Sequence, residues 1–227
     1  MKLSVVIPCY NEEKTIQEIV NLVEQVEGID KEIVVVDDGS KDQSRSILKE
    51  LAKNRPHLKV ILKDKNSGKG ATLREGFKHT TGDYIIVQDA DLEYNPHDYL
   101  KLIEEVNKGA QVVYGSRFNG DYKDMTSLHF MGNRILTLIT NLLYGTHLSD
   151  METCYKLMPG DFVRGLELKA DRFDFEPEIT SKILKSGMKI SEVPISYKGR
   201  SWKEGKKITW KDGMHALVTL VKYRFTN

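Results

Sequence analysis

The chain has 227 residues, a length that suits one large domain or one domain with a C-terminal extension. Its 34 Lys and Arg residues almost balance 33 Asp and Glu residues, so the overall charge argues against a nucleic-acid-binding protein. The two cysteines, Cys9 and Cys154, are too few for a disulfide framework, and we expect a cytoplasmic protein. The apolar run after Met1 is too short for a signal peptide, and no run of about 18 uncharged apolar residues predicts a membrane span.

Short apolar runs alternate with amphipathic segments through the first half of the chain. The apolar runs predict strands at Leu3–Ile7, Glu32–Val36, Leu58–Leu62, Tyr84–Gln88 and Gln111–Tyr114. Helical spacing of apolar residues predicts helices from Ile16 to Val26, around Ile47 to Leu51, after Gly70 through Phe77, and from Pro96 to Val106. We expect Pro8 to end the first strand and Asp42 or Ser44 to cap the second helix. Such alternation indicates an α/β fold with a mostly parallel sheet flanked by helices.

The second half of the chain is less regular. Its pattern predicts helices at Ser127–Tyr144, Phe175–Ser186 and Trp210–Phe225, and a strand at Lys189–Ile195. In the first of these helices the apolar residues form one stripe, made of Leu128, Met131, Ile135, Leu138, Ile139 and Leu142. The sequence contains no internal repeat or linker, so we expect a single domain over residues 1–227.

Polar, acidic or glycine-rich residues follow every predicted strand of the first half. They are Pro8-Cys9-Tyr10-Asn11-Glu12, Asp37-Asp38, Asn66 to Lys69, Asp89-Ala90-Asp91 and Gly115-Ser116-Arg117. Parallel sheets bind ligands beyond the carboxyl ends of their strands, and these ends lie along one edge. We therefore expect a binding site at this edge of the sheet.

Asp89 and Asp91 come directly after a predicted buried strand. Two carboxylates this close repel each other, and burying them costs free energy unless a positive group neutralises them. A hard divalent cation would do so, and it would keep coordination positions for water and for diphosphate oxygens. For an isolated Asp-x-Asp, a solvated acidic loop is the alternative. Because the other polar strand ends are expected at the same edge of the sheet, a cation-binding role is favoured here.

Three other strand ends each have a functional and a structural interpretation. Asp37 and Asp38 offer acceptors to the N–H donors of a nucleobase, or they form an Asx turn. Lys69 suits phosphate contact although the Walker A pattern is absent; a solvated lysine at a glycine-containing helix start is the alternative. Arg117 suits a bidentate phosphate contact or an ordinary surface ion pair.

Taken together in their order and spacing, these strand-end motifs resemble the inverting family 2 glycosyltransferases with the GT-A fold. The most similar group is the dolichyl-phosphate or polyprenyl-phosphate mannose and glucose synthases. The resemblance is strong from Met1 to about Gly120 and weaker beyond it, through Ser149-Asp150, Glu178, Val193-Pro194-Ile195 and Arg200 to Lys207. It implies that residues 1–120 bind the nucleotide sugar and that residues 121–227 bind the acceptor and form an extension.

The resemblance also implies roles for individual residues. Nucleoside contacts fall on Pro8, Tyr10, Glu12, Val36 and Asp38, and further donor contacts fall on Lys69 and Ala90. Asp89 and Asp91 would bind Mg²⁺ or Mn²⁺ on the donor diphosphate. Glu93 is a third candidate ligand, at a position where the mannose synthases often have Gln. Phosphate contacts fall on Arg117, Arg200 and Lys206, and the residues implied in catalysis are Asp91, Arg117, Asp150 and Arg200.

The nature of the acceptor decides whether a general base is needed. A lipid phosphate, with a second pKa of roughly 6, is largely ionised at neutral pH and needs only arginines to position it. A sugar hydroxyl would need a carboxylate base, for which Asp150 or Glu152 is the candidate; both residues could instead shape a turn. The implied reaction is hexose transfer to a polyprenyl or dolichyl phosphate, with GDP-mannose the favoured donor and UDP-glucose the other.

A lipid acceptor implies contact with a membrane surface. The helix at 127–144 is amphipathic, and the stretch from Lys198 to Lys211 combines six basic residues with Trp202 and Trp210. We expect peripheral binding on the cytoplasmic face, with or without a separate membrane-protein partner. The alternative is that the helix packs on its own core and that the basic stretch is solvated.

Three other classes of protein fit the sequence less well. Sugar nucleotidylyltransferases open with a glycine-rich loop, whereas the first strand here ends in Pro8-Cys9-Tyr10-Asn11. Haloacid-dehalogenase-type phosphatases carry Asp-x-Asp on their first strand with an accompanying Thr, whereas here Asp89-Ala90-Asp91 follows the fourth predicted strand. A non-catalytic nucleotide-binding protein is the alternative outside enzymes, and the Asp89/Asp91 pair argues against it.

Overall fold

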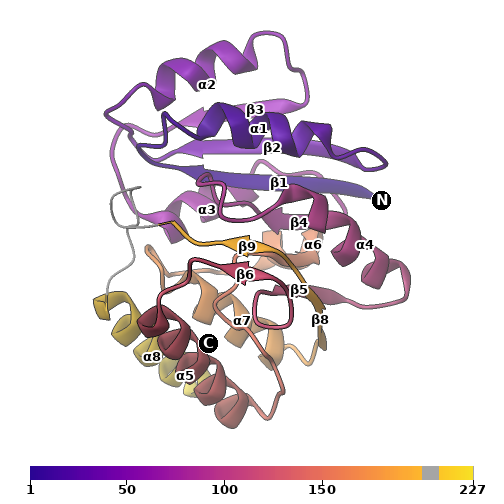
Figure 1. Cartoon of the computed structure of the whole chain (residues 1–227), viewed down its shortest axis with the longest axis vertical. Coiled ribbons are helices and arrows are strands. Elements are labelled where there is room, and N and C mark those ends of the chain that lie inside the picture. The colour runs from indigo at the N-terminus through magenta and orange to yellow at the C-terminus, as the bar shows by residue number, and fades with distance from the viewer. Residues whose placement is uncertain (201–209, 227) are drawn as a thin grey trace. The chain divides into compact units, whose positions relative to one another are not determined.

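A computed structural model of the chain describes residues 1–200 and 210–226. Figure 1 shows the described chain, which divides into two compact units. The first unit consists of Met1–His97 and Lys156–Arg172, and the second of Asp98–Tyr155 and Phe173–Asn227. This division differs from the boundary at residue 120 that separates the predicted donor and acceptor halves. Those halves are defined by function and stay a prediction.

The first unit is built on a mostly parallel sheet. Its strands are β1 (Lys2–Cys9), β2 (Asp30–Asp37), β3 (Leu58–Leu62), β4 (Tyr84–Val87) and β7 (Lys156–Pro159). Their order is β3-β2-β1-β4-β7, and only the β4–β7 pairing is antiparallel. The long apolar runs of β1 and β2 lie in the middle of this order, where strands are covered on both faces, so they are buried almost throughout.

Four helices accompany this sheet: α1 (Ile16–Gln25), α2 (Ser44–Ala52), α3 (Lys69–Phe77) and α6 (Gly160–Gly165). The helix α1 turns Ile16, Ile19, Val20 and Val23 inward, as their spacing predicts. The helix α3 packs on β1 and β2, and Gly76 lets it come close, because a Cβ there would overlap Val6. The carboxyl-edge loops that follow the strands are therefore held between well-packed elements.

The second unit contains a parallel strand pair, a short two-stranded ribbon and a group of long helices. The strands β5 (Val112–Ser116) and β8 (Ile190–Pro194) are parallel, and β6 (Tyr122–Lys123) pairs with β9 (Tyr197–Lys198) in a short ribbon. The helix α4 (Tyr99–Asn107) follows a 3₁₀ turn at Pro96–Asp98 and packs on β5. The helices α5 (Ser127–Tyr144), α7 (Phe175–Lys185) and α8 (Trp210–Phe225) pack on one another, and Figure 1 shows α5 and α8 side by side.

The α/β fold class and the predicted elements are confirmed, with two local differences. Pro8 does not end β1, which continues to Cys9. The reason is that β4 pairs with β1 only as far as Val6, so Pro8 has β2 as its sole strand neighbour. At the start of α2 the residue before the helix makes no side-chain cap, and Asp42 Oδ1 accepts from the Ser44 amide at 3.0 Å.

Apart from Ile139, the apolar stripe predicted on α5 faces outward rather than into the core. Leu128 is 76% exposed, Leu138 58% and Leu142 75%, and Met131 and Ile135 are also exposed. The opposite side packs inward through Leu136, Ile139 and Leu143, against a cluster of Leu148, Met151 and Leu220. The neighbouring α8 likewise exposes Met214, Val218, Val221 and Phe225. Of the helices in the described ranges, none is long and apolar enough to span a membrane.

Glu32 ties together the amino ends of β1 and β2 and the turn before β4. Its carboxylate accepts from Ser4 Oγ at 2.5 Å, from the Thr81 amide and hydroxyl, and from Lys2 Nζ. Burial by itself would raise the pKa of Glu32, but these donors outweigh it and lower the pKa from 4.5 to about 2.

Replacing Glu32 with Gln is therefore expected to lower the free energy of unfolding at pH 7 by about 1–2 kcal/mol. Because the folded pKa is depressed, this contribution is complete above the unfolded pKa and disappears as the pH falls toward 2. Urea unfolding at several pH values should show the two proteins converging in acid. A constant difference between pH 7 and pH 3 would contradict this linkage.

Candidate functional site

The loops after β1 and β2 interlock at the carboxyl edge of the first unit. The Asn11 amide donates to Ser40 Oγ at 2.9 Å, and the Lys41 amide donates to Asn11 Oδ1 at 2.8 Å. The Glu12 amide donates to Ser44 Oγ at 2.9 Å. Asn11 has φ +52°, a left-handed conformation that costs free energy for a residue with a side chain. These two strand ends therefore form one ordered surface.

The predicted nucleoside residues on β1, β2 and the loop after β1 differ in how accessible they are. Pro8 and Tyr10 are half-buried and have exposed surface at this edge. Glu12 is buried, and its carbonyl accepts from the amides of Thr15 and Ile16 at the start of α1. Val36 is fully buried, with its side chain beside Gly76 of α3. The nucleoside contacts remain predictions, and Pro8 and Tyr10 are the residues with surface available for them.

Asp37 and Asp38 both use their carboxylates inside the protein. Asp37 Oδ2 accepts from the amides of Gly39 and Ser40, which is the Asx turn considered above, and from Arg45. Asp38 accepts from Lys63 Nζ at 2.6 Å and from the amides of Ser67 and Gly68 at 3.0 and 2.8 Å. Asp38 therefore fixes the loop that leads into α3, and its predicted nucleoside contact is a separate, untested role. The buried Asp37 Oδ1 accepts no hydrogen bond from the described residues.

The start of α3 is closed by a segment that sequence reasoning did not connect with it. The amides of Gly70 and Ala71 donate to the carbonyls of Arg172 and Asp171 at 3.2 and 3.1 Å. A Cβ on Gly68 would overlap the Asp171 carbonyl, and a Cβ on Gly70 would overlap the Ala170 carbonyl. The two glycines thus allow residues 170–172 to lie against the helix start, and these two amides already have acceptors.

Lys69 is neither a solvated lysine nor a surface ion-pair partner. Its Nζ lies 2.8 Å from Asp89 Oδ1, and the two side chains are 12% and 22% exposed. The residue stands at the first position of α3, after Gly68 with φ +95°. The helix start and the Asp-x-Asp loop are therefore joined by an ion pair.

The Asp-x-Asp loop places two half-buried carboxylates at the carboxyl edge, with the buried Ala90 between them. Asp91 Oδ1 accepts from the Glu93 amide at 3.2 Å, and the intervening Leu92 has φ +62°. A left-handed leucine is uncommon, so the surroundings must impose this conformation. In residues 1–200 and 210–226, no three His, Cys, Asp or Glu side chains form a ready metal-binding group. Two carboxylates nevertheless fit a Mg²⁺-like ion that takes its other ligands from water and phosphates.

Arg117 and Asp150 form a buried ion pair in the second unit. The Arg117 side chain donates from Nε and Nη2 to the two Asp150 oxygens at 2.7 Å, and its amide donates to Asp150 at 3.0 Å. The exposed fractions of the two side chains are 7% and 0%. The guanidinium also lies over the rings of Tyr197 and Phe118, at 5.2 and 5.6 Å. The interpretation of Arg117 as an ordinary surface ion pair is wrong.

Glu192 on β8 binds the backbone next to this ion pair. Its carboxylate accepts from the Ser149 amide at 2.8 Å and from the Asp150 amide at 3.1 Å. Burial raises the pKa of Glu192, those amides lower it, and the charge of Asp150 raises it further. Glu192 therefore holds the backbone of the loop that presents Asp150 to Arg117.

Arg134 is a candidate that sequence reasoning missed. It lies exposed on α5, 5.6 Å from the Phe118 ring that Arg117 also contacts, and its Nη1 lies 3.4 Å from the Ser149 carbonyl. The sequence did contain a clue to Arg134, because it is the only Asp, Glu, Lys or Arg in the sequence of α5. Arg200 is half-buried at the end of a described range, whereas Lys206 and Trp202 lie outside the described residues.

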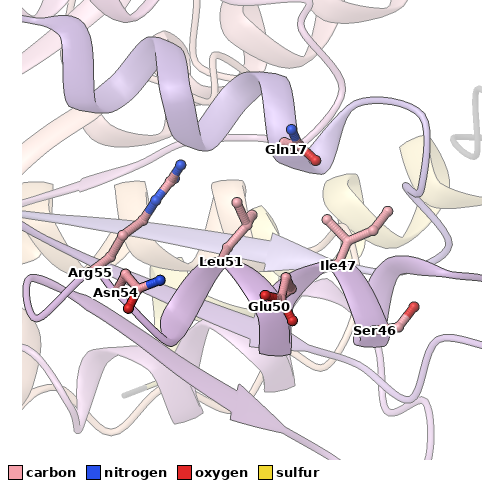
Figure 2. Close-up of a pocket in the computed structure, with 7 residues that line it drawn as sticks. All are labelled: Gln17, Ser46, Ile47, Glu50, Leu51, Asn54 and Arg55. Carbon is pink, nitrogen blue, oxygen red and sulfur yellow. The ribbon is translucent and has the colours of Figure 1, made fainter.

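A groove beside α1 and α2 of the first unit is lined by the side chains that Figure 2 shows. Its volume is about 570 Å³, and it is lined by Gln17, Ser46, Ile47, Glu50, Leu51, Asn54 and Arg55. None of the predicted site residues lines it. The groove is therefore separate from the carboxyl-edge loops.

Three curated relatives are similar along most of this chain. The dolichol-phosphate mannosyltransferase of Pyrococcus furiosus is 31% identical over 217 residues, which cover 92% of this chain and 61% of that protein. The dolichyl-phosphate beta-glucosyltransferase ALG5A of Trichomonas vaginalis is 32% identical and covers 86% and 65%. An undecaprenyl-phosphate 4-deoxy-4-formamido-L-arabinose transferase of Enterobacter is 28% identical and covers 90% and 62%. The chain thus spans less than two thirds of the length of these relatives.

A solved structure and a family model complete the comparison. Glucosyl-3-phosphoglycerate synthase from Mycobacterium tuberculosis, in complex with Mn²⁺, UDP and glucosyl-3-phosphoglycerate, aligns with a TM-score of 0.74. The alignment covers 98% of this chain and 79% of that one at 19% identity, which shows a shared fold. Residues 4–163, well over half of the chain, match the model of glycosyl transferase family 2. The resemblance seen in the strand-end motifs is confirmed, and the chain belongs to glycosyl transferase family 2.

Proposed function

We propose that the protein transfers a hexose from a nucleotide sugar to a polyprenyl or dolichyl phosphate, with inversion at the anomeric carbon. All three curated relatives bear the names of transferases specific for lipid phosphates. Because those names differ in the sugar, they do not decide between the two donors, and GDP-mannose remains favoured over UDP-glucose. The observation that carries the acceptor assignment is the closed ion pair between Arg117 and Asp150.

This ion pair argues against Asp150 as the base that a hydroxyl acceptor would need. A general base must reach the proton that it removes, but both oxygens of the fully buried Asp150 already accept from Arg117. A phosphate nucleophile needs no such base, since its second pKa of roughly 6 leaves it largely ionised at neutral pH. Asp150 then serves as a positioning residue that orients the Arg117 guanidinium.

The acceptor phosphate would bind to arginines of the second unit. Arg117 is buried and neutralised by Asp150, whereas the neighbouring Arg134 is exposed on the same aromatic ring. We therefore add Arg134 to Arg117, Arg200 and Lys206 as a phosphate contact. Planar guanidinium groups suit phosphate oxygens because they donate two parallel hydrogen bonds.

The donor would bind at the carboxyl edge of the first unit. Pro8 and Tyr10 offer surface to the nucleoside, and Asp89 and Asp91, with Glu93 nearby, would hold Mg²⁺ or Mn²⁺. When bound, such an ion neutralises the negative charge of the departing nucleoside diphosphate. A protein with a related fold was solved in complex with Mn²⁺ and UDP, which supports a nucleotide-sugar donor with a divalent cation.

The exposed apolar residues of α5 and α8 support peripheral binding to a membrane, as a lipid acceptor requires. Replacing Leu138 and Leu142 together with Glu should lower binding to anionic vesicles at least tenfold, because each leucine loses about 1.5–3 kcal/mol of burial. Flotation with phosphatidylglycerol vesicles measures this loss. Leu100 on α4 is also exposed, and Leu100→Glu is the matched control that should float normally. Undiminished binding of the double variant would exclude this face as the membrane surface.

One assay tests the proposed function. The purified protein is incubated with Mn²⁺, a polyprenyl phosphate and a panel of nucleotide sugars, and product mass and nucleotide release are recorded. We expect a glycosylated lipid phosphate, no product without a divalent cation, and no product from the free polyprenol. Transfer to sugar hydroxyls alone would establish the alternative acceptor, and nucleotide binding without any transfer would establish a non-catalytic protein.

A further inference from the structure

The ammonium group of Lys69 contacts Asp89, one of the two carboxylates proposed to bind the divalent cation. Its Nζ lies 2.8 Å from Asp89 Oδ1, and both side chains are largely buried. A carboxylate that is short of water is stabilised strongly by one close ammonium group. In the absence of donor and metal, Lys69 therefore supplies the counter-charge that the Asp-x-Asp loop needs.

The position of Lys69 is fixed by backbone contacts on both sides. Asp38 accepts from the amides of Ser67 and Gly68 just before it, and the carbonyls of Arg172 and Asp171 accept from the amides of Gly70 and Ala71 just after it. Neither adjacent glycine leaves room for a Cβ. The fold thus holds the backbone of Lys69 close to Asp89, with which its side chain pairs.

We infer that Lys69 is an internal competitor of the divalent cation, and that it passes from Asp89 to the donor diphosphate when cation and donor bind together. The inference rests on the proposed function, because it concerns the same metal and donor. An ammonium group and a divalent cation on one carboxylate repel each other, so metal alone must displace Lys69. A nucleoside diphosphate offers the displaced ammonium new oxygens. Cation and nucleotide then bind with positive coupling, and each strengthens the other equally.

Direct Mn²⁺ binding tests this competition without any measurement of activity. Free Mn²⁺ is followed by its electron paramagnetic resonance signal for the wild type, Lys69→Met, Lys69→Arg and Lys2→Met. Lys2 likewise pairs with a carboxylate, that of Glu32, but it lies at the amino end of β1. The Lys2→Met variant therefore controls for the loss of one positive charge. Urea unfolding confirms that each variant is folded.

Without nucleotide, we expect Lys69→Met to bind Mn²⁺ about tenfold more tightly than the wild type, whereas Lys69→Arg and Lys2→Met bind it as the wild type does. Adding GDP or UDP should tighten Mn²⁺ binding by the wild type and do so much less for Lys69→Met. Equal or weaker Mn²⁺ binding by Lys69→Met would overturn the competition while leaving the donor site intact. A wild type that binds no Mn²⁺ even with GDP or UDP would overturn the proposed metal-dependent function as well.

Discussion

Replacing Asp150 with Asn is expected to lower the free energy of unfolding by about 3–5 kcal/mol, because Arg117 then keeps its charge in a buried site without a carboxylate. Urea unfolding measures the change. The exposed pair Arg164–Asp161 has a similar N···O distance, 2.6 Å against 2.7 Å, but Asp161 is fully exposed. Asp161→Asn is therefore the matched control and should leave stability almost unchanged.

A double variant separates the charge from the packing at this position. Arg117→Met combined with Asp150→Leu removes both charges, so its stability should recover at least half of what Asp150→Asn loses. If the double variant is as unstable as Asp150→Asn, the loss reflects packing and not an unpaired charge.

The same Asp150→Asn variant distinguishes the two acceptors. Asn keeps one acceptor oxygen for Arg117, so the folded variant should retain substantial transfer to polyprenyl phosphate. Loss of a general base would instead cost roughly 10²–10⁴-fold in rate. An abolished rate in correctly folded protein would favour the hydroxyl acceptor and return Asp150 to the role of a base.

Replacing Asp91 with Asn is expected to lower kcat/KM for transfer by roughly 10³-fold, since stabilisation of the leaving diphosphate by a metal is worth several kcal/mol. The Asp91 side chain is half-buried and its Oδ1 accepts from the Glu93 amide, which the side-chain oxygen of Asn can also do, so the fold should survive. Initial rates of nucleotide release over a range of donor concentrations measure the effect.

A matched control for Asp91 lies at the other end of the sheet. Asp30 is exposed at the amino end of β2, so Asp30→Asn removes the same charge from the same unit and should leave transfer unchanged. Equal activity of Asp91→Asn and the wild type, or full activity in excess chelator, would refute the metal-site assignment.

Periodicity predicted most elements because the apolar spacing of each was unambiguous. The boundaries of β3 and α5 match the prediction, and α1, α3 and β4 differ by a residue or so. Pro8 was misjudged because its effect depends on how far β4 extends, which no local pattern states. In α5, apolar residues occupy two sides, and periodicity cannot tell which side meets the core.

The site was predictable where it depended on strand ends and less so where distant segments meet. The carboxyl-edge loops follow from the alternation of strands and helices. The contact between Arg117 and Asp150 spans 33 positions, and no spacing rule connects the two. Gly68 and Gly70 suggested phosphate binding, but their close neighbours are the carbonyls of residues 170–172, about a hundred positions later. Such contacts depend on tertiary packing rather than on local sequence.

The contact of residues 170–172 with α3 also constrains how this protein can vary. Loops between helices usually accept inserted or deleted residues, because their backbone faces solvent. Here the stretch between α6 and α7 must deliver the carbonyls of Asp171 and Arg172 to one helix start, and its length is set by that requirement. An added residue would misalign the carbonyls and free the helix that carries Lys69. This connection is consequently a poor place to graft a tag, a linker or a foreign domain.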